Sequence, residues 1–208
     1  MNAPGFFLVI EGPSGIGKTT VTGLVHDELQ ASGAPVLATK EPSTSPIGAM
    51  ARSGTHDYRG LALACLVAAD RYHHLDQEIG PALRDGAIVV CDRYVPSSLV
   101  LQALDGVDAE FARQLNQHAP PPDLTVILTG APERTRKRAR DRGASSRFHR
   151  DDATRHAAED RMYRALISEL RKGGWDLLHH DLGDEPAADV ARLILDALRS
   201  RRPARSDR

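Results

Sequence analysis

The stretch Glu11-Gly12-Pro13-Ser14-Gly15-Ile16-Gly17-Lys18-Thr19-Thr20 fits the pattern G-x-x-x-x-G-K-[ST], and it decides the fold. An apolar run, Phe6 to Ile10, precedes it and is predicted to be a buried strand, and a helical pattern begins at Lys18. A glycine-rich turn lets backbone N–H groups point at phosphate oxygens, and the positive end of the helix dipole strengthens that field. Strand, turn and helix start together predict a phosphate-binding P-loop.

Two side chains of this loop have chemistry of their own. Lys18 can reach the β- and γ-phosphates of a nucleotide as a point charge, and Thr19 can offer its hydroxyl to Mg²⁺. A second motif, Ile88-Val89-Val90-Cys91-Asp92-Arg93-Tyr94, ends four apolar residues with an acid at the carboxyl edge of a strand. Asp92 there suits Mg²⁺ binding, directly or through water, and Arg93 could hold a second phosphate. The alternative for the second motif is a surface ion pair.

Composition narrows the class of protein. The chain has 208 residues, of which 41% are hydrophobic and 26% charged, as in ordinary globular proteins. A formal net charge of −1 argues against a generic nucleic-acid binder. Cys65 and Cys91 lie in apolar runs and are expected to be buried thiols in a reducing compartment. With no apolar stretch of membrane-spanning length, we expect a cytoplasmic protein without a membrane partner.

The pattern along the chain is of short apolar runs that alternate with helical segments, which predicts an α/β fold with a mostly parallel sheet covered by helices on both faces. Predicted strands are Phe6–Glu11, Pro35–Lys40, Ala87–Asp92, Leu124–Thr129 and Trp175–Asp181. Predicted helices are Lys18–Ser32, Tyr58–Arg84, Ala109–Ala119, Pro132–Arg142, Arg150–Lys172 and Pro186–Arg201, with shorter ones near Pro46–Arg52 and Pro96–Ala103. Residues 1–200 are predicted to form one domain, and 201–208 a disordered tail.

Three further features place cations near the carboxyl edge of that sheet, where ligands bind in such folds. Lys40 follows the second strand, and Arg71 interrupts an apolar helix face. A buried arginine is costly unless it is paired or binds an anion, and the alternative is a surface charge cluster with Asp70. An arginine-rich run from Arg134 leads into a Gly/Ser segment, which predicts a mobile lid over about residues 140–149. The nine histidines form no convincing metal site.

Taken together, these residues resemble the thymidylate kinases, P-loop nucleoside monophosphate kinases of about this length. The resemblance runs from Phe6 to about Arg199 and includes the Lys40-Glu41-Pro42 element, Ala68–Arg71 and Asp92-Arg93-Tyr94 with Pro96-Ser97-Ser98. It implies a five-stranded parallel sheet, a homodimer, and transfer of the ATP γ-phosphoryl group to a nucleotide 5′-phosphate.

The resemblance also implies roles for single residues. Lys18 and Thr19 would serve ATP and Mg²⁺, with Asp92 positioning the metal. Lys40 and Arg93 would grip the acceptor phosphate. The lid would supply a catalytic arginine, for which Arg140, Arg142 and Arg147 are candidates. The residues implied at the acceptor are Glu11, Ser14, Lys40, Val67, Arg71, Arg93, Ser97, Ser98 and Leu101.

The departures from the family pattern all fall on the acceptor side. Ser14 stands where the P-loop usually has an acid, and Lys40-Glu41-Pro42-Ser43-Thr44-Ser45 replaces Arg-Glu-Pro-Gly-Gly-Thr. Val67 replaces the phenylalanine that stacks on thymine, and Leu101 replaces an aromatic against the deoxyribose. Losing a stacking aromatic removes about 1 kcal/mol of base affinity.

The leading hypothesis is therefore an ATP-dependent kinase that converts dTMP to dTDP. One alternative keeps the scaffold but uses another nucleotide or a small metabolite as acceptor. Another alternative, from a different class, is a nucleotide-binding regulator or NTPase without an acceptor, against which the lid arginines and the Asp92-Arg93 pair argue.

Overall fold

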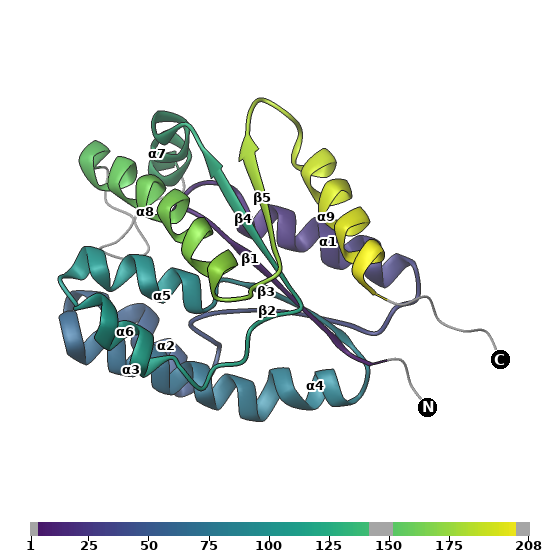
Figure 1. Ribbon diagram of the computed structural model, residues 1–208, viewed down its shortest axis with the longest axis horizontal. Helices are drawn as coiled ribbons and strands as arrows, with labels where there is room; N and C mark the ends of the chain where they lie inside the picture. Colours follow the sequence, from purple (N-terminus) through teal and green to yellow (C-terminus); the bar gives the residue numbers. More distant parts are fainter. Residues whose placement is uncertain (1–3, 142–151, 203–208) are drawn as a thin grey trace.

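The computed structural model describes residues 4–141 and 152–202, and these residues form a five-stranded, all-parallel sheet flanked by helices (Figure 1). The strands are β1 (Phe6–Glu11), β2 (Val36–Lys40), β3 (Ile88–Asp92), β4 (Leu124–Gly130) and β5 (Leu177–Leu182). They lie in the order β2-β3-β1-β4-β5, so the strand that leads into the P-loop is central. The predicted fold class is confirmed, and every predicted strand is present, most with slightly shifted ends.

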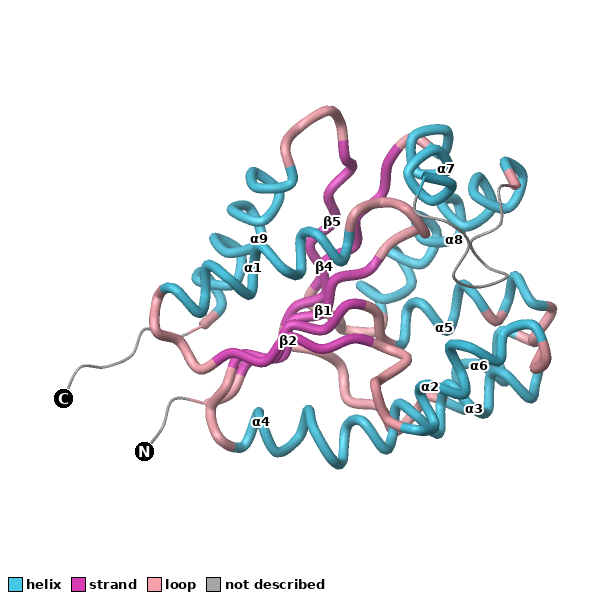
Figure 2. The backbone as a smooth tube through the Cα atoms, turned by 180° about the vertical axis from the view of Figure 1, so that it is seen from behind, coloured by secondary structure: helices cyan, strands magenta, loops and turns pink. Residues whose placement is uncertain are grey.

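Alternation along β1 divides the core between the two faces of the sheet, because successive side chains of a strand point in opposite directions. Phe6, Leu8 and Ile10 pack on one face in a cluster that α1 (Lys18–Ala31) and α9 (Ala187–Arg201) complete. Figures 1 and 2 show these two helices side by side on that face. Phe7 and Val9 belong to a second cluster on the opposite face.

Several helices cover the opposite face. They are α3 (Gly60–His74), α4 (Gly80–Arg84), α5 (Val95–Leu101) and α8 (Ala153–Lys172), with α2 (Pro46–Ser53) and α6 (Ala109–Leu115) packed on α3 and α5. The helix α7 (Pro132–Asp141) follows β4 and packs on α8. Short 3₁₀ turns lie at Gly54–His56 and Ala103–Asp105. The loops after β1, β2, β3 and β4 therefore open at one end of the sheet, among α2, α5, α7 and α8.

Some predicted boundaries differ from the structure. The helix predicted over Tyr58–Arg84 begins at Gly60 and is interrupted by a wide π-helical turn at Leu75–Ile79. Pro81 accounts for this turn, because proline lacks an N–H and its ring crowds the carbonyl four residues earlier. The helix α9 ends at Arg201, as predicted, and Nε of Arg201 lies 2.6 Å from Asp176. Most of the predicted lid and residues 203–208 lie outside the described residues.

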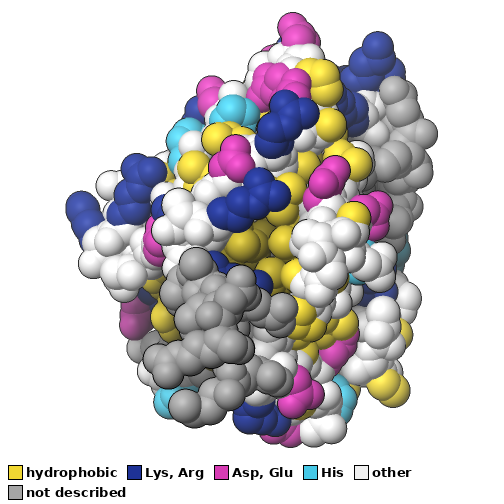
Figure 3. All heavy atoms as spheres, turned by 90° about the vertical axis from the view of Figure 1, so that its right-hand side faces the viewer, with side chains coloured by type: hydrophobic (Ala, Val, Ile, Leu, Met, Phe, Trp, Pro, Cys, Tyr) yellow, Lys and Arg dark blue, Asp and Glu magenta, His cyan; other side chains and the backbone are white. Residues whose placement is uncertain are grey.

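Charges of both signs mix on the molecular surface that Figure 3 shows, with apolar side chains between them. On α9, Arg192 pairs with Asp189 and Arg199 with Asp196, each across three residues of the helix. Cys91 is buried as expected, whereas Cys65 is exposed, because its side of α3 faces away from the sheet. None of the helices in the described part of the chain is long and apolar enough to cross a membrane.

Candidate active site

The loop between β1 and α1 has the backbone geometry of a phosphate cradle. Gly12 has a φ of 141°, and a Cβ there would lie 2.1 Å from the carbonyl oxygen of Leu128, so only glycine fits. Gly17, with a φ of 112°, is the N-cap of α1 and provides no side-chain cap. The first N–H groups of α1 therefore remain available to an anion at the positive end of the helix.

Lys18 is held inside this loop. The residue is 4% exposed, and Nζ donates hydrogen bonds to the carbonyl oxygens of Gly12 at 2.7 Å and Pro13 at 2.8 Å. Burial and the nearby Arg93 lower the pKa of Lys18 to about 7, although Asp92 and other carboxylates oppose the shift. The ammonium group is thus placed where bound phosphates would restore its charge.

Thr19 and Asp92 meet at the mouth of the loop. The Thr19 hydroxyl donates to Asp92 Oδ2 at 2.6 Å, and among the described residues the buried Asp92 Oδ1 finds no hydrogen-bond partner. Hydroxyl and carboxylate oxygens suit Mg²⁺, which usually takes its other ligands from phosphates and water. No cluster of three His, Cys, Asp or Glu side chains in the described part of the chain could hold a metal alone. The pair therefore fits a Mg²⁺ ion that arrives with a nucleotide.

Two cations flank Asp92 at the carboxyl edge of the sheet. Arg93 follows β3 with a φ of 77°, and its Nη1 donates to Ser97 Oγ at 2.9 Å. Burial would lower the pKa of Arg93, but the surrounding groups, among them Tyr163 and Glu159, raise it, so the guanidinium stays charged. Lys40 pairs in register with Asp92 on the neighbouring strand β2, and its side chain is exposed. An anion at this edge could contact both.

Glu11 joins β1 to two helices beneath this edge. Its carboxylate is fully buried and accepts hydrogen bonds from Tyr94 N at 2.6 Å, Ser97 Oγ at 2.7 Å and Tyr163 Oη at 3.1 Å. Burial raises the pKa of Glu11, against the lowering effect of Arg93 and these donors. Glu11, predicted at the acceptor, thus lies under Ser97 and fixes its hydroxyl.

Arg71 is buried and fully paired. The residue is 1% exposed, with Nε 2.7 Å from Glu41 Oε2 and Nη2 donating to Ser98 Oγ at 2.9 Å. Nη1 donates to the amide oxygen of Asn116, and the guanidinium lies 5.2 Å from the centre of the Tyr94 ring. Such pairing offsets the cost of burying the charge. Arg71 therefore joins the segment after β2 to α5 and to the end of α6.

Asp70 is buried and binds other residues than Arg71, so the two do not form a surface charge cluster. Its fully buried carboxylate accepts from Ser43 N at 2.6 Å, Ser43 Oγ at 2.5 Å and Ser45 Oγ at 2.9 Å. These bonds fix the segment after Glu41 against α3. The serines that depart from the family pattern are thereby bound to a carboxylate that the helix supplies.

The other predicted residues are placed as follows. Val67, one turn before Arg71 on α3, and Leu101, at the end of α5, are both partly buried. Ile16 is buried in the core, Thr20 is exposed on α1, and Gly15 has a φ of 83°. Both donors of Ser14 bind Glu159. Arg140 lies exposed near the end of α7, whereas Arg142 and Arg147 lie outside the described residues.

Sequence reasoning missed Glu41 as the partner of Arg71, and also Asn116, Glu159 and Tyr163. On α8 a signal existed, since Glu159 and Tyr163 are four residues apart and share the buried face with Leu166 and Leu170. Polar residues on an otherwise apolar helix face indicate a buried polar contact. For Asn116, at the end of α6, the sequence offers no comparable signal.

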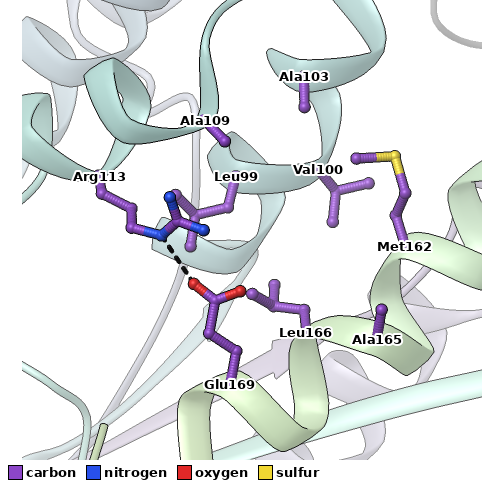
Figure 4. Close-up of a pocket in the computed structure, with 9 residues that line it drawn as sticks. All are labelled: Leu99, Val100, Ala103, Ala109, Arg113, Met162, Ala165, Leu166 and Glu169. Carbon is purple, nitrogen blue, oxygen red and sulfur yellow. Dashed lines mark hydrogen bonds and ion pairs between the residues drawn. The ribbon is translucent and has the colours of Figure 1, made fainter.

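A separate cavity of about 160 Å³ lies among α5, α6 and α8 (Figure 4). Apolar side chains, including Leu99, Val100 and Met162, line most of it, and Arg113 pairs with Glu169 at 2.7 Å along its edge. None of the predicted site residues lines this cavity. The candidate active site is therefore the edge where the P-loop, Asp92 and Arg93 converge.

Comparison with known proteins identifies the family. The thymidylate kinase family model matches residues 10–173. The chain is 38% identical to a probable thymidylate kinase of Pyrobaculum aerophilum over 193 residues, which cover 90% of this chain and 95% of the relative. It is 38% identical to the thymidylate kinase of Leifsonia xyli over 182 residues, or 82% and 86% of the two chains. The chain therefore belongs to the thymidylate kinase family.

Proposed function

We propose that this protein is an ATP-dependent kinase that transfers the γ-phosphoryl group of ATP to the 5′-phosphate of dTMP. The observation that carries the proposal is the convergence of the P-loop, Asp92 and Arg93 at one sheet edge. Membership of the thymidylate kinase family supports dTMP as the acceptor.

The donor would lie on the loop from Gly12 to Thr20. Backbone N–H groups and Lys18 would hold its phosphates, since the glycines leave room for close approach and Lys18 is already in the loop. The Thr19 hydroxyl and the Asp92 carboxylate would supply some of the oxygen ligands of Mg²⁺. Bound Mg²⁺ would neutralise charge on the β- and γ-phosphates.

The acceptor would lie across α3 and α5. Lys40 and Arg93 would bind its phosphate, with Ser97 orienting Arg93. Arg71 and Ser98 would face its base and sugar, supported by Glu41 from behind. Val67 and Leu101 would supply apolar contact to the nucleoside on either side. An aliphatic pocket binds a base less strongly than an aromatic one does. We therefore expect the wild-type protein to have a higher KM for dTMP than a variant that carries an aromatic side chain in this pocket.

Positioning and charge would drive the reaction. Lys40 and Arg93 would hold the acceptor phosphate oxygen in line with the γ-phosphate, and no protein base is needed because that oxygen is already anionic near neutral pH. One or more of Arg140, Arg142 and Arg147 would neutralise charge on the transferring group, and closure of their segment would exclude water.

The test is ADP release by the purified protein with Mg-ATP and a panel of acceptors: dTMP, dUMP, dCMP, dGMP, UMP and CMP. We expect strong stimulation by dTMP above all others. Stimulation by a different acceptor would reassign the substrate, and Val67 and Leu101 are the residues that would explain such a change. ATP binding without stimulation by any acceptor would refute the kinase proposal for this panel.

We also propose that the protein is a cytoplasmic homodimer. The outer side of α3 exposes Leu61 at 58%, together with Ala62, Cys65 and Ala69, which share one side of the helix. Exposed Met50 and Phe111 lie on the neighbouring helices α2 and α6. Light scattering should give twice the monomer mass, and Leu61→Glu should shift it toward the monomer. A monomeric wild type would contradict the proposal.

A further inference from the structure

Glu159 is a buried carboxylate that lies beside the P-loop. Glu159 of α8 is 1% exposed, and its Oε1 accepts hydrogen bonds from both Ser14 N at 2.9 Å and Ser14 Oγ at 3.1 Å. The two residues are 145 positions apart in sequence, so the contact is a purely tertiary one. Glu159 thereby takes up one backbone N–H of the loop that could otherwise have faced a phosphate.

Glu159 interacts electrostatically with Lys18 and Arg93. Its field raises the pKa values of Lys18 and Arg93, against the effect of burial on each. A buried carboxylate is costly unless hydrogen bonds and opposite charges compensate it, and Ser14, Lys18 and Arg93 provide that compensation. Glu159 thus acts electrostatically both on Lys18, proposed to bind the donor, and on Arg93, proposed to bind the acceptor.

A second polar side chain of α8 reaches the acceptor side by the same face. Tyr163, four residues after Glu159, has its hydroxyl 3.0 Å from Ser97 Oγ and 3.1 Å from Glu11 Oε2. Ser97 in turn accepts from Arg93. One face of α8 therefore contacts the P-loop through Glu159, and through Tyr163 it contacts Ser97, which holds Arg93.

We propose that Glu159 is a positioning residue for phosphoryl transfer, which fixes the Ser14 corner of the P-loop and keeps Arg93 oriented toward the acceptor phosphate. The inference rests on the proposed function for its kinetic consequence. Without the Glu159 charge, Arg93 would lose one of the carboxylates that act on it and keep its hydrogen bond to Ser97, so the two phosphates would be aligned less well. Since Glu159 itself repels phosphates, its loss should slow the transfer step without weakening binding.

The first test compares Glu159→Gln with Glu169→Gln. The amide introduced by Glu159→Gln keeps an oxygen for Ser14 but loses the charge, and Glu169 is a matched control on the same helix, 49% exposed and paired with Arg113. We expect Glu159→Gln to lower kcat for dTMP about 10- to 100-fold, with KM values for ATP and dTMP unchanged or lower. The control should stay within about twofold of wild type, as expected for a change to an exposed ion pair.

The second test moves the carboxylate from position 159 to position 14, on the other side of the Ser14–Glu159 contact. Ser14→Asp alone places two carboxylates side by side, so binding of the non-hydrolysable Mg-AMP-PNP, measured calorimetrically, should weaken by about tenfold or more. Ser14→Asp with Glu159→Gln restores a single carboxylate at the same place. Binding of the double variant should return to within about threefold of wild type, and part of the lost kcat should return with it.

The outcomes separate this inference from the proposed function. A wild type that does not phosphorylate dTMP contradicts the proposed function, while the AMP-PNP binding cycle still tests Glu159. Additive effects of the two substitutions in that cycle overturn the inference. An unchanged kcat in Glu159→Gln, or a raised KM with normal kcat, also overturns it, because a positioning residue must affect the transfer step.

Discussion

The proposed donor side and the proposed acceptor side of this site are built in different ways. The donor side is made mainly of backbone from one continuous segment, with Gly12 and Gly17 in conformations that side chains disfavour. The acceptor side is made of side chains from separate elements, with Arg71 bound to residues that follow β2, lie on α5 and end α6. A backbone cradle recognises the phosphates of any nucleoside triphosphate, whereas a side-chain network can change its ligand by single substitutions. The difference is consistent with the position of most departures from the family pattern, which lie outside the P-loop at Ser43, Val67 and Leu101.

The largest effect on turnover is expected from a substitution of Lys18 in the P-loop. Lys18→Ala should lower kcat about 10³-fold, because it removes the cation proposed to hold the phosphates of ATP. Stability should change little, because relief from burying the charge of Lys18 offsets the loss of the hydrogen bonds from Nζ to Gly12 and Pro13. Coupled ADP-release kinetics and thermal unfolding measure the two effects. Lys172→Ala, an exposed site on α8, is the control. A variant with normal turnover would remove the P-loop from the mechanism.

The next effect breaks the acceptor side, and it should appear in stability as well as activity. Arg71→Ala leaves the buried Glu41 without its arginine and, among the described residues, with only His74 Nδ1 within ion-pair distance, at 3.5 Å, so the free energy of unfolding should fall by about 3–5 kcal/mol. Urea denaturation measures this change. Arg192→Ala removes an exposed arginine whose Nη1 lies 3.0 Å from Asp189, and it should cost less than about 1 kcal/mol. Equal losses in the two variants would show that the Arg71 network contributes little.

A smaller effect tests the Thr19–Asp92 pair. Asp92→Asn should lower kcat about 10²-fold, the size expected for one electrostatic contact to the reacting group. It should also raise the Mg²⁺ concentration that gives half-maximal rate, because the carboxylate is a proposed ligand. A Mg²⁺ titration at saturating ATP measures both. An unchanged Mg²⁺ dependence would place the metal elsewhere, and Asp196→Asn on α9 is the control.

The smallest expected effect concerns position 67, where valine stands in place of an aromatic residue. Val67→Phe should improve base stacking by about 1 kcal/mol and lower KM for dTMP roughly fivefold, with KM for ATP unchanged. Val67→Leu adds volume without an aromatic ring and should not reproduce the gain. A change in KM for ATP, or equal effects of Phe and Leu, would mean that position 67 does not contact the base.

The sequence was most informative where structure is local. The P-loop was predictable because strand, turn and helix start are consecutive, and the strands because short apolar runs alternate with helical segments. The π-helical turn at Leu75–Ile79 was not predicted, although Pro81 was visible, because proline can either end a helix or be absorbed by a wider turn.

Tertiary contacts of the site were harder to predict. Arg71 was identified from its place on an apolar helix face, but its partners Glu41 and Asn116 come from segments 30 and 45 residues away. Glu159 and Ser14 are farther apart still, and no local pattern links them. Such pairs depend on how α8 packs over the sheet edge, which hydrophobic periodicity alone does not specify.

The central claim is that the γ-phosphoryl group passes to dTMP at this sheet edge. Incubating the protein with Mg-ATP labelled at the γ-phosphate and with dTMP, then separating the products by chromatography, tests it directly. We expect label in dTDP, formed in equal amount with ADP, and loss of that product in Lys18→Ala. Label that appears only in inorganic phosphate, whatever the amount of dTMP, would contradict the account and indicate an NTPase.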